Sequence, residues 1–146
     1  MTTHTLEAAI PAIAAVVIAT DAIKGTGLPA DNQSEYPLAM TYVGDFQGGG
    51  DITQGLIMYH NVYIDILAPL EQGLQNIFPV FNAAIDELST DLITEVVTDG
   101  GHFSNTIDTF ESLTGYLLPD YPYGNIPMIG YRIVMNGVKL LNESIV

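Results

Sequence analysis

Lysine and arginine are scarce in this chain. Its 146 residues include three bases, Lys24, Arg132 and Lys139, against 17 acids, so the formal net charge is -14. The acid count is near that of an ordinary globular chain, and the imbalance therefore comes from missing bases. A nucleic-acid-binding surface needs a stripe of bases to neutralise phosphates, and a polybasic membrane anchor needs a similar cluster. The composition excludes both classes.

Cysteine is absent, and histidine is rare. A chain without cysteine has no disulfide framework and no thiolate metal site. The three histidines are His4, His60 and His102. None of them belongs to a known catalytic or metal-binding motif. The paired acids Asp86 and Glu87, and Asp91 with Glu95, fit a solvated helix face. We therefore expect no enzyme activity, no metal and no cofactor.

No hydrophobic run is long enough to cross a bilayer. The longest, Ala8–Ala19, has twelve residues, whereas a helix that spans the roughly 30 Å hydrocarbon core needs about 20. Glu7 precedes it and no base occurs before Lys24, so the run lacks the leader of a signal peptide. Because 48% of the residues are apolar, the chain is expected to fold around a sizeable core.

Two segments have the apolar spacing of helices. The first spans about 6–23, and Pro11 within it favours a start nearer residue 10. The second spans about 70–97, and Pro79 within it predicts either a kink or two successive helices, 70–77 and 79–95.

Four segments alternate between apolar and polar residues as strands do. They lie at 37–44, 56–67, 106–116 and 126–140, the last as a strand or a strand pair. With the helices, they give the order α-β-β-α-β-β. The predicted fold class is α+β, an antiparallel four-stranded sheet with helices packed on one face. We expect a single domain over residues 1–146, frayed at residues 1–4.

Residues 45–55 are rich in glycine, with four in eleven residues. Such a segment predicts a flexible loop between two strands, and it needs a partner to order it. We expect the docking or lumen contact in its first part, at Asp45, Phe46, Gln47, Gly48, Gly49, Gly50 and Asp51. A phosphate-binding loop is discounted because no GxxxxGK[ST] motif is present.

The segment 117–125 is predicted to be a second loop, with two prolines and two tyrosines. Tyrosine buries a large area at low entropy cost and keeps a polar tip, which suits an interface. Tyr121 and Tyr123 are therefore candidates for a subunit contact. Arg132, one of the three bases, is a third candidate, and we expect it to pair with an acid of the same or a neighbouring subunit.

Several short motifs occur in an order that resembles a known family. They are Tyr36-Pro37-Leu38, Tyr42-Val43-Gly44-Asp45, the strand 59–69 that ends in proline, Phe78-Pro79, Thr106–Phe110, Tyr123-Gly124 and Ile129–Ile133. In this order, over residues 5 to 140, they resemble the tail terminator (tail completion) proteins of long-tailed, siphovirus-type bacteriophages.

The resemblance implies a structural virion protein that is assembled in the host cytoplasm. Copies would form a ring, expected to be a hexamer, that caps the head-proximal end of the tail tube and ends tube polymerisation. The implied partners are other copies of the chain, the tail tube protein and a head completion or neck protein. Genomic DNA would pass through the ring without specific binding, and no membrane would be involved.

Two other functions remain open at this point. The chain could be another phage neck, tail-tube or baseplate-hub subunit, or a small-ligand binding module that uses its tyrosine-rich loops. The scarcity of bases suits a lumen that DNA crosses, because a surface without bases does not hold phosphates. An acidic surface that suits salty surroundings is the alternative explanation of the charge.

Overall fold

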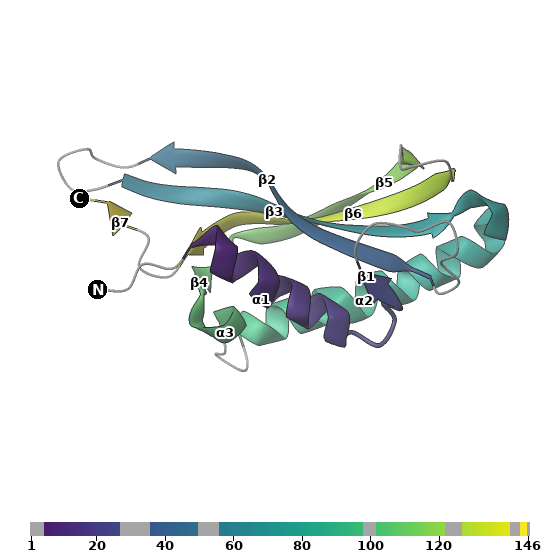
Figure 1. The fold of residues 1–146 in the computed structure, drawn as a ribbon, viewed down its shortest axis with the longest axis horizontal. Coiled ribbons are helices and arrows are strands. Elements are labelled where there is room, and N and C mark those ends of the chain that lie inside the picture. Colours follow the sequence, from purple (N-terminus) through teal and green to yellow (C-terminus); the bar gives the residue numbers. More distant parts are fainter. Residues whose placement is uncertain are drawn as a thin grey trace.

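A long, curled antiparallel sheet carries two helices on one of its faces in the computed structural model of the chain (Figure 1). The structure describes residues 5–26, 36–49, 56–97, 102–121, 127–140 and 144–145. The elements are α1 (Leu6–Ala19), β1 (Gly25–Thr26), β2 (Leu38–Gly49), β3 (Leu56–Pro69), the 3-10 turn η1 (Leu70–Gln72), α2 (Leu74–Val97), α3 (His102–Asn105), β4 (Ile107–Thr109), β5 (Ser112–Tyr121), β6 (Met128–Leu140) and β7 (Ser144–Ile145). This single α+β domain confirms the predicted fold class.

Four long strands form the sheet in the spatial order β2-β3-β6-β5, and each neighbouring pair is antiparallel. The short strands lie at its margins: β1 is parallel to the start of β2, β4 pairs with the end of β6, and β7 pairs with the start of β3. Relative to β3, β2 has an extra residue between Val43 and Phe46, and β6 has an extra residue between Met135 and Val138. Such extra residues bend a strand and re-aim its side chains.

The core lies between the sheet and the helices. Successive strand residues point to opposite faces, so Val62, Ile64 and Ile66 of β3 all face the helices, and each is 0% exposed. They pack in one cluster with residues of α1 and α2 that recur at helical spacing. These are Ala9, Ile13, Val17, Ile77, Phe81, Ala84, Leu88 and Leu92. Burial of these two stripes orients both helices on one face of the sheet.

Both helices contain a proline and remain continuous through it. The helix α1 begins at Leu6 with Pro11 inside, and α2 begins at Leu74 with Pro79 inside. The predicted late start of the first helix is therefore wrong, and so is the division of the second into two helices, the other alternative to a kink at Pro79. Each proline is exposed and removes only one internal hydrogen bond, whose carbonyl can be hydrated. The buried stripe of α2 begins before Pro79, at Ile77, so packing holds the helix together across it.

The glycine-rich segment is partly strand. Asp45–Gly49 belong to β2, which contradicts the predicted loop for these residues, because β3 supplies pairing partners as far as Gly49 opposite Ile57. The predicted residues Gly50 and Asp51 lie outside the described residues.

The second predicted loop is also partly strand, since β5 continues to Tyr121 by pairing with β6. Tyr123 lies outside the described residues. The strand predicted at 106–116 is instead divided between β4 and β5. Within the described ranges, no helix has both the length and the apolarity needed to span a membrane.

Candidate functional site

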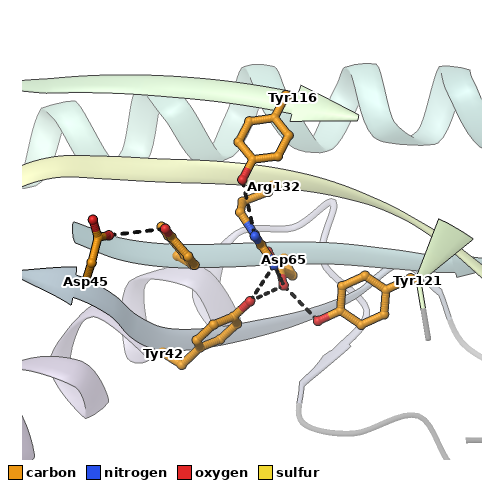
Figure 2. A network of polar contacts seen from close by, with 7 residues as sticks. Tyr42, Asp45, Asp65, Tyr116, Tyr121 and Arg132 are labelled. Carbon is orange, nitrogen blue, oxygen red and sulfur yellow. Dashed lines mark hydrogen bonds and ion pairs between the residues drawn. The ribbon is translucent and has the colours of Figure 1, made fainter. Parts of the chain in front are cut away.

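The sheet face opposite the helices carries one arginine, one aspartate and four tyrosines in mutual contact (Figure 2). We call this group the Arg132 cluster; its members are Tyr42, Tyr63, Asp65, Tyr116, Tyr121 and Arg132. The register brings them together: Tyr42 lies opposite Tyr63, and Asp65 lies opposite Arg132. On the other side of β6, Tyr116 also lies opposite Arg132. All four long strands thus contribute.

Asp65 is the buried centre of the cluster, with a side chain that is 0% exposed. Its Oδ1 accepts a hydrogen bond from Arg132 Nε at 2.8 Å, and its Oδ2 accepts one from Nη2 at 3.1 Å. The same Oδ2 accepts the hydroxyls of Tyr121 at 2.7 Å and of Tyr42 at 2.5 Å. A buried carboxylate is tolerated only when it is paired and hydrogen-bonded, and both conditions are met here.

The guanidinium of Arg132 is held on several sides. Besides Asp65, its Nη2 donates to the Tyr42 hydroxyl at 2.7 Å, and its Nη1 donates to the Tyr116 hydroxyl at 3.2 Å. Its central carbon lies 4.6 Å from the centroid of the Tyr63 ring, close enough for a cation–π interaction. The hydrogen bond to Asp65 raises the pKa of Arg132, so the group is always charged.

Glycines make room for two of the tyrosine rings. A Cβ on Gly44 would lie 2.5 Å from Cζ of Tyr63, so that ring can lie over β2 only because position 44 has no side chain. A Cβ on Gly130 would lie 3.2 Å from Cδ2 of Tyr121 and 3.0 Å from Cδ2 of Leu67. A glycine in a strand often marks such a close approach. These two positions help to aim Tyr63 and Tyr121 into the cluster.

The chemistry of the cluster suits recognition. Both oxygens of the Asp65 carboxylate already accept hydrogen bonds from side chains of the cluster. Burial raises the pKa of both Tyr42 and Tyr121, which keeps their hydroxyls protonated at neutral pH. The outer part is accessible, since Tyr116 is 46% exposed and the side chain of Arg132 is 20% exposed. Fixed tyrosine and arginine side chains are typical of the energetic centres of interfaces. Among the described residues, no group of three or more His, Cys, Asp or Glu side chains could hold a metal ion.

The buried tyrosines make alkaline stability a test of the cluster. Burial, followed by the hydrogen bond to Asp65, raises the pKa of Tyr42 from 10.0 to about 12, and burial raises that of Tyr121 as well. Because the folded state holds the Tyr42 proton more tightly than the unfolded state, the stabilisation from Tyr42 is complete below pH 10 and is lost as the pH rises through 12. We expect the urea midpoint to fall across this window.

The control for this titration is Tyr42→Phe, which removes one of the titrating hydroxyls. Its urea midpoint should start lower and then fall less steeply with pH than that of the wild type. The appearance of tyrosinate, followed by ultraviolet absorbance, should accompany the loss of structure. A wild-type midpoint that stays constant across the window would contradict the buried placement of these hydroxyls.

The structure brings several predicted site residues to this face. Arg132 pairs with Asp65 of its own chain. Tyr121 is 8% exposed, and its hydroxyl donates to Asp65. Asp45 adjoins the cluster because its Oδ1 accepts the Tyr63 hydroxyl at 3.2 Å. Phe46, by contrast, is 64% exposed and its ring lies beside that of His60.

Sequence reasoning missed four members of the cluster: Tyr42, Tyr63, Asp65 and Tyr116. One signal was available. Asp65 lies in the middle of a long apolar strand, where a charge must find a partner, and the chain has only three bases to offer. The tyrosines could not be assigned to the site in this way, because the contacts between them depend on which strands are neighbours in the sheet.

No model of a known protein family matches the chain, and no curated protein matches it in sequence. What the chain does is therefore inferred from its fold and its surfaces.

Proposed function

We propose that this chain is a structural subunit of a bacteriophage tail. Copies form a ring, a hexamer as the resemblance to tail terminator proteins implies, that caps the head-proximal end of the tail tube and ends its polymerisation. The ring offers its other side to a head completion or neck protein. On this proposal the chain is not an enzyme and needs no cofactor.

The observation that carries the proposal is the exposed far end of β2, which pairs with the start of β3. These strands extend beyond the helices at one end of the molecule (Figure 1). Two apolar side chains of β2 are exposed, Val43 at 37% and Phe46 at 64%. Among the described residues, β1 pairs with β2 only at Leu38 and Ala39, which leaves the outer edge of β2 open beyond them. An open strand edge beside exposed apolar side chains is a template for docking another chain.

The sheet geometry is compatible with a ring. The four long strands run between an end near Pro37 and a far end near Phe46, and these two ends are different surfaces. The first end of one copy can therefore approach the far end of the next. A contact between two different surfaces of the same chain is heterologous, and it closes into a ring when the rotation per subunit allows.

The charge distribution is also compatible with a lumen that DNA crosses. Arg132 pairs with Asp65 at 2.8 Å, and Lys139 pairs with Asp108 at 3.5 Å. Of the three bases in the chain, only Lys24 lacks such an ion pair among the described residues. Passing phosphates would meet at most one free lysine per subunit, so they would not be held.

The proposal is tested with Phe46→Asp, which places a charge on the exposed end of β2. We expect the wild type to form rings, alone or on purified tail tubes, as measured by analytical ultracentrifugation. Electron micrographs should show these rings at one end of tubes of uniform length. The variant should fold normally, because Phe46 is exposed, but should cap tubes poorly and leave them overlong.

The matched control is Ile18→Asp, which charges an exposed apolar residue of α1 (57% exposed) and should leave capping intact. A wild-type chain that stays monomeric in the presence of tubes, with tube lengths unaffected, would refute the proposal. Decoration along the whole tube would also refute it and would identify a tube subunit instead.

A further inference from the structure

A polar pocket lies next to the Arg132 cluster, towards the far end of β2. It is a cavity of about 590 Å³, and we call it the Asp45 pocket. The residues that matter to its chemistry are Asp45, Tyr59, Asn61, Glu111 and Asn136. Its volume is within the range of ligand-binding clefts. No residue of the Arg132 cluster lines it.

Irregularities in the strands create this pocket. Gly137 of β6 has a φ of +65°, and its N–H donates to Oδ1 of Asn61 at 3.2 Å. The amide nitrogen of Asn61 donates in turn to Oδ1 of Asp45 at 3.1 Å. Glu111 lies directly over Gly137, where an added Cβ would come within 2.7 Å of the Glu111 Cδ. Asn61 thus stands between two carboxylates that border one cavity.

The lining favours a cationic side chain. Asp45 and Glu111 supply negative charge, and none of the three bases of the chain lines the cavity. The hydrogen bond from Asn61 lowers the pKa of Asp45, so this carboxylate is ionised at neutral pH. Tyr59 adds an aromatic ring, which attracts an alkylammonium group through its face and covers the apolar stem of that group.

Within the part of the chain that the structure describes, only one base has no ion pair and could fill such a pocket. Arg132 forms an ion pair with Asp65, and Lys139 forms one with Asp108. Lys24 is exposed, and its Nζ donates to the backbone carbonyl of Asp21 at 2.8 Å without an ion pair to any described carboxylate.

Lys24 cannot reach the pocket of its own subunit. Its N–H donates to the carbonyl of Pro37, just before β2 begins at Leu38, whereas the pocket lies near Asp45 and Phe46. At the rise of a strand, these two places are about 25 Å apart. The lysine and the pocket are therefore at opposite ends of β2, as the two sides of a head-to-tail contact would be.

We infer that the Asp45 pocket receives Lys24 from a neighbouring copy of the chain. The inference rests on the proposed ring and names one contact that would hold it together. Subunits of net charge -14 repel one another, so a contact that brings a free base to two carboxylates offsets part of that repulsion. Because each copy presents a lysine at one end and a pocket at the other, the contact repeats around the ring.

The first test is Lys24→Met, which keeps the length of the side chain and removes its charge. We expect the concentration at which rings form to rise by about tenfold, with the melting temperature of the subunit unchanged. The matched control is Lys139→Met, which removes a base that is paired within its own subunit and should leave assembly unchanged. High salt should weaken the wild-type ring and have less effect on the Lys24→Met ring.

The second test uses the absence of cysteine in the chain. With Lys24→Cys and Glu111→Cys combined, mild oxidation of assembled rings should link neighbouring subunits into a covalent ladder. Either cysteine variant alone should not give this ladder. Because the native chain has no cysteine, every link in the ladder reports the designed contact.

The outcomes separate the contact from the ring. Wild-type rings that form normally, with no ladder and no effect of Lys24→Met, would overturn the contact and leave the proposed function standing. A wild-type chain that never assembles would overturn the proposed function itself. If Asp45→Asn with Glu111→Gln impairs capping while Lys24→Met does not, the pocket receives a base of the tube or neck protein, and the inference fails.

Discussion

Arg132→Ala is expected to destabilise the protein by about 3–5 kcal/mol, because it leaves the carboxylate of Asp65 buried without its counter-charge. The Asp65 side chain is 0% exposed, so water cannot replace the guanidinium. The two tyrosine hydroxyls that remain on Oδ2 carry no charge. For a chain of this length the loss corresponds to a fall in melting temperature of roughly 10–15 °C. Circular dichroism is the measurement, since the chain has no tryptophan.

Lys139→Ala is the matched control for this prediction. Lys139 also pairs with an aspartate, Asp108, but the two side chains are 31% and 45% exposed, so its loss should cost less than about 1 kcal/mol. In Asp65→Ala with Arg132→Ala no charge is left buried, and the double variant should be more stable than Arg132→Ala alone. Equal melting temperatures for Arg132→Ala and Lys139→Ala would show that the cluster is not a buried ion pair.

Phe81→Ala is expected to cost about 3–5 kcal/mol, because it opens a cavity in the middle of the core. Phe81 is 2% exposed and belongs to the cluster in which α2 packs against β3 and β6. Its position, soon after Pro79 in the same helix, makes it a probe of whether α2 is continuous there. Urea unfolding followed by circular dichroism measures the loss.

Phe78→Ala is the control, since it removes the same ring from the same helix three residues earlier. Phe78 is 40% exposed, and its loss should cost less than about 1 kcal/mol. A larger loss for Phe78→Ala than for Phe81→Ala would mean that α2 turns a different face to the sheet.

Local pattern was enough to predict most of the fold. The helical spacing of Ile77, Phe81, Leu88 and Leu92 predicted α2, and the alternation in 56–67 predicted β3. These predictions hold because a helix or strand that packs on one side shows its period in a single segment of sequence. They failed where tertiary contacts overrode local preference, at Pro79 and at Asp45–Gly49. Packing of α2 on the sheet and pairing of β2 with β3 decided those cases.

The candidate site was predicted in fragments. Arg132 and Tyr121 were named from composition and Asp45 from its glycine-rich surroundings, but nothing local linked them to Asp65. Their contact requires β6 to lie between β3 and β5, so that positions 65, 132 and 116 share one row. Strand order is set by long-range packing, which a single segment does not record.

By itself the sequence determined the class of the fold, the lack of any basic surface and the scarcity of partners for 17 acids. Only the tertiary structure decided which bases form ion pairs with acids of their own subunit. Arg132 is buried against Asp65 because two distant strands pair in register, whereas the exposed Lys24, directly before β1, forms no ion pair with any described residue. Composition counts charges, but distance and burial decide which of them can still attract a partner.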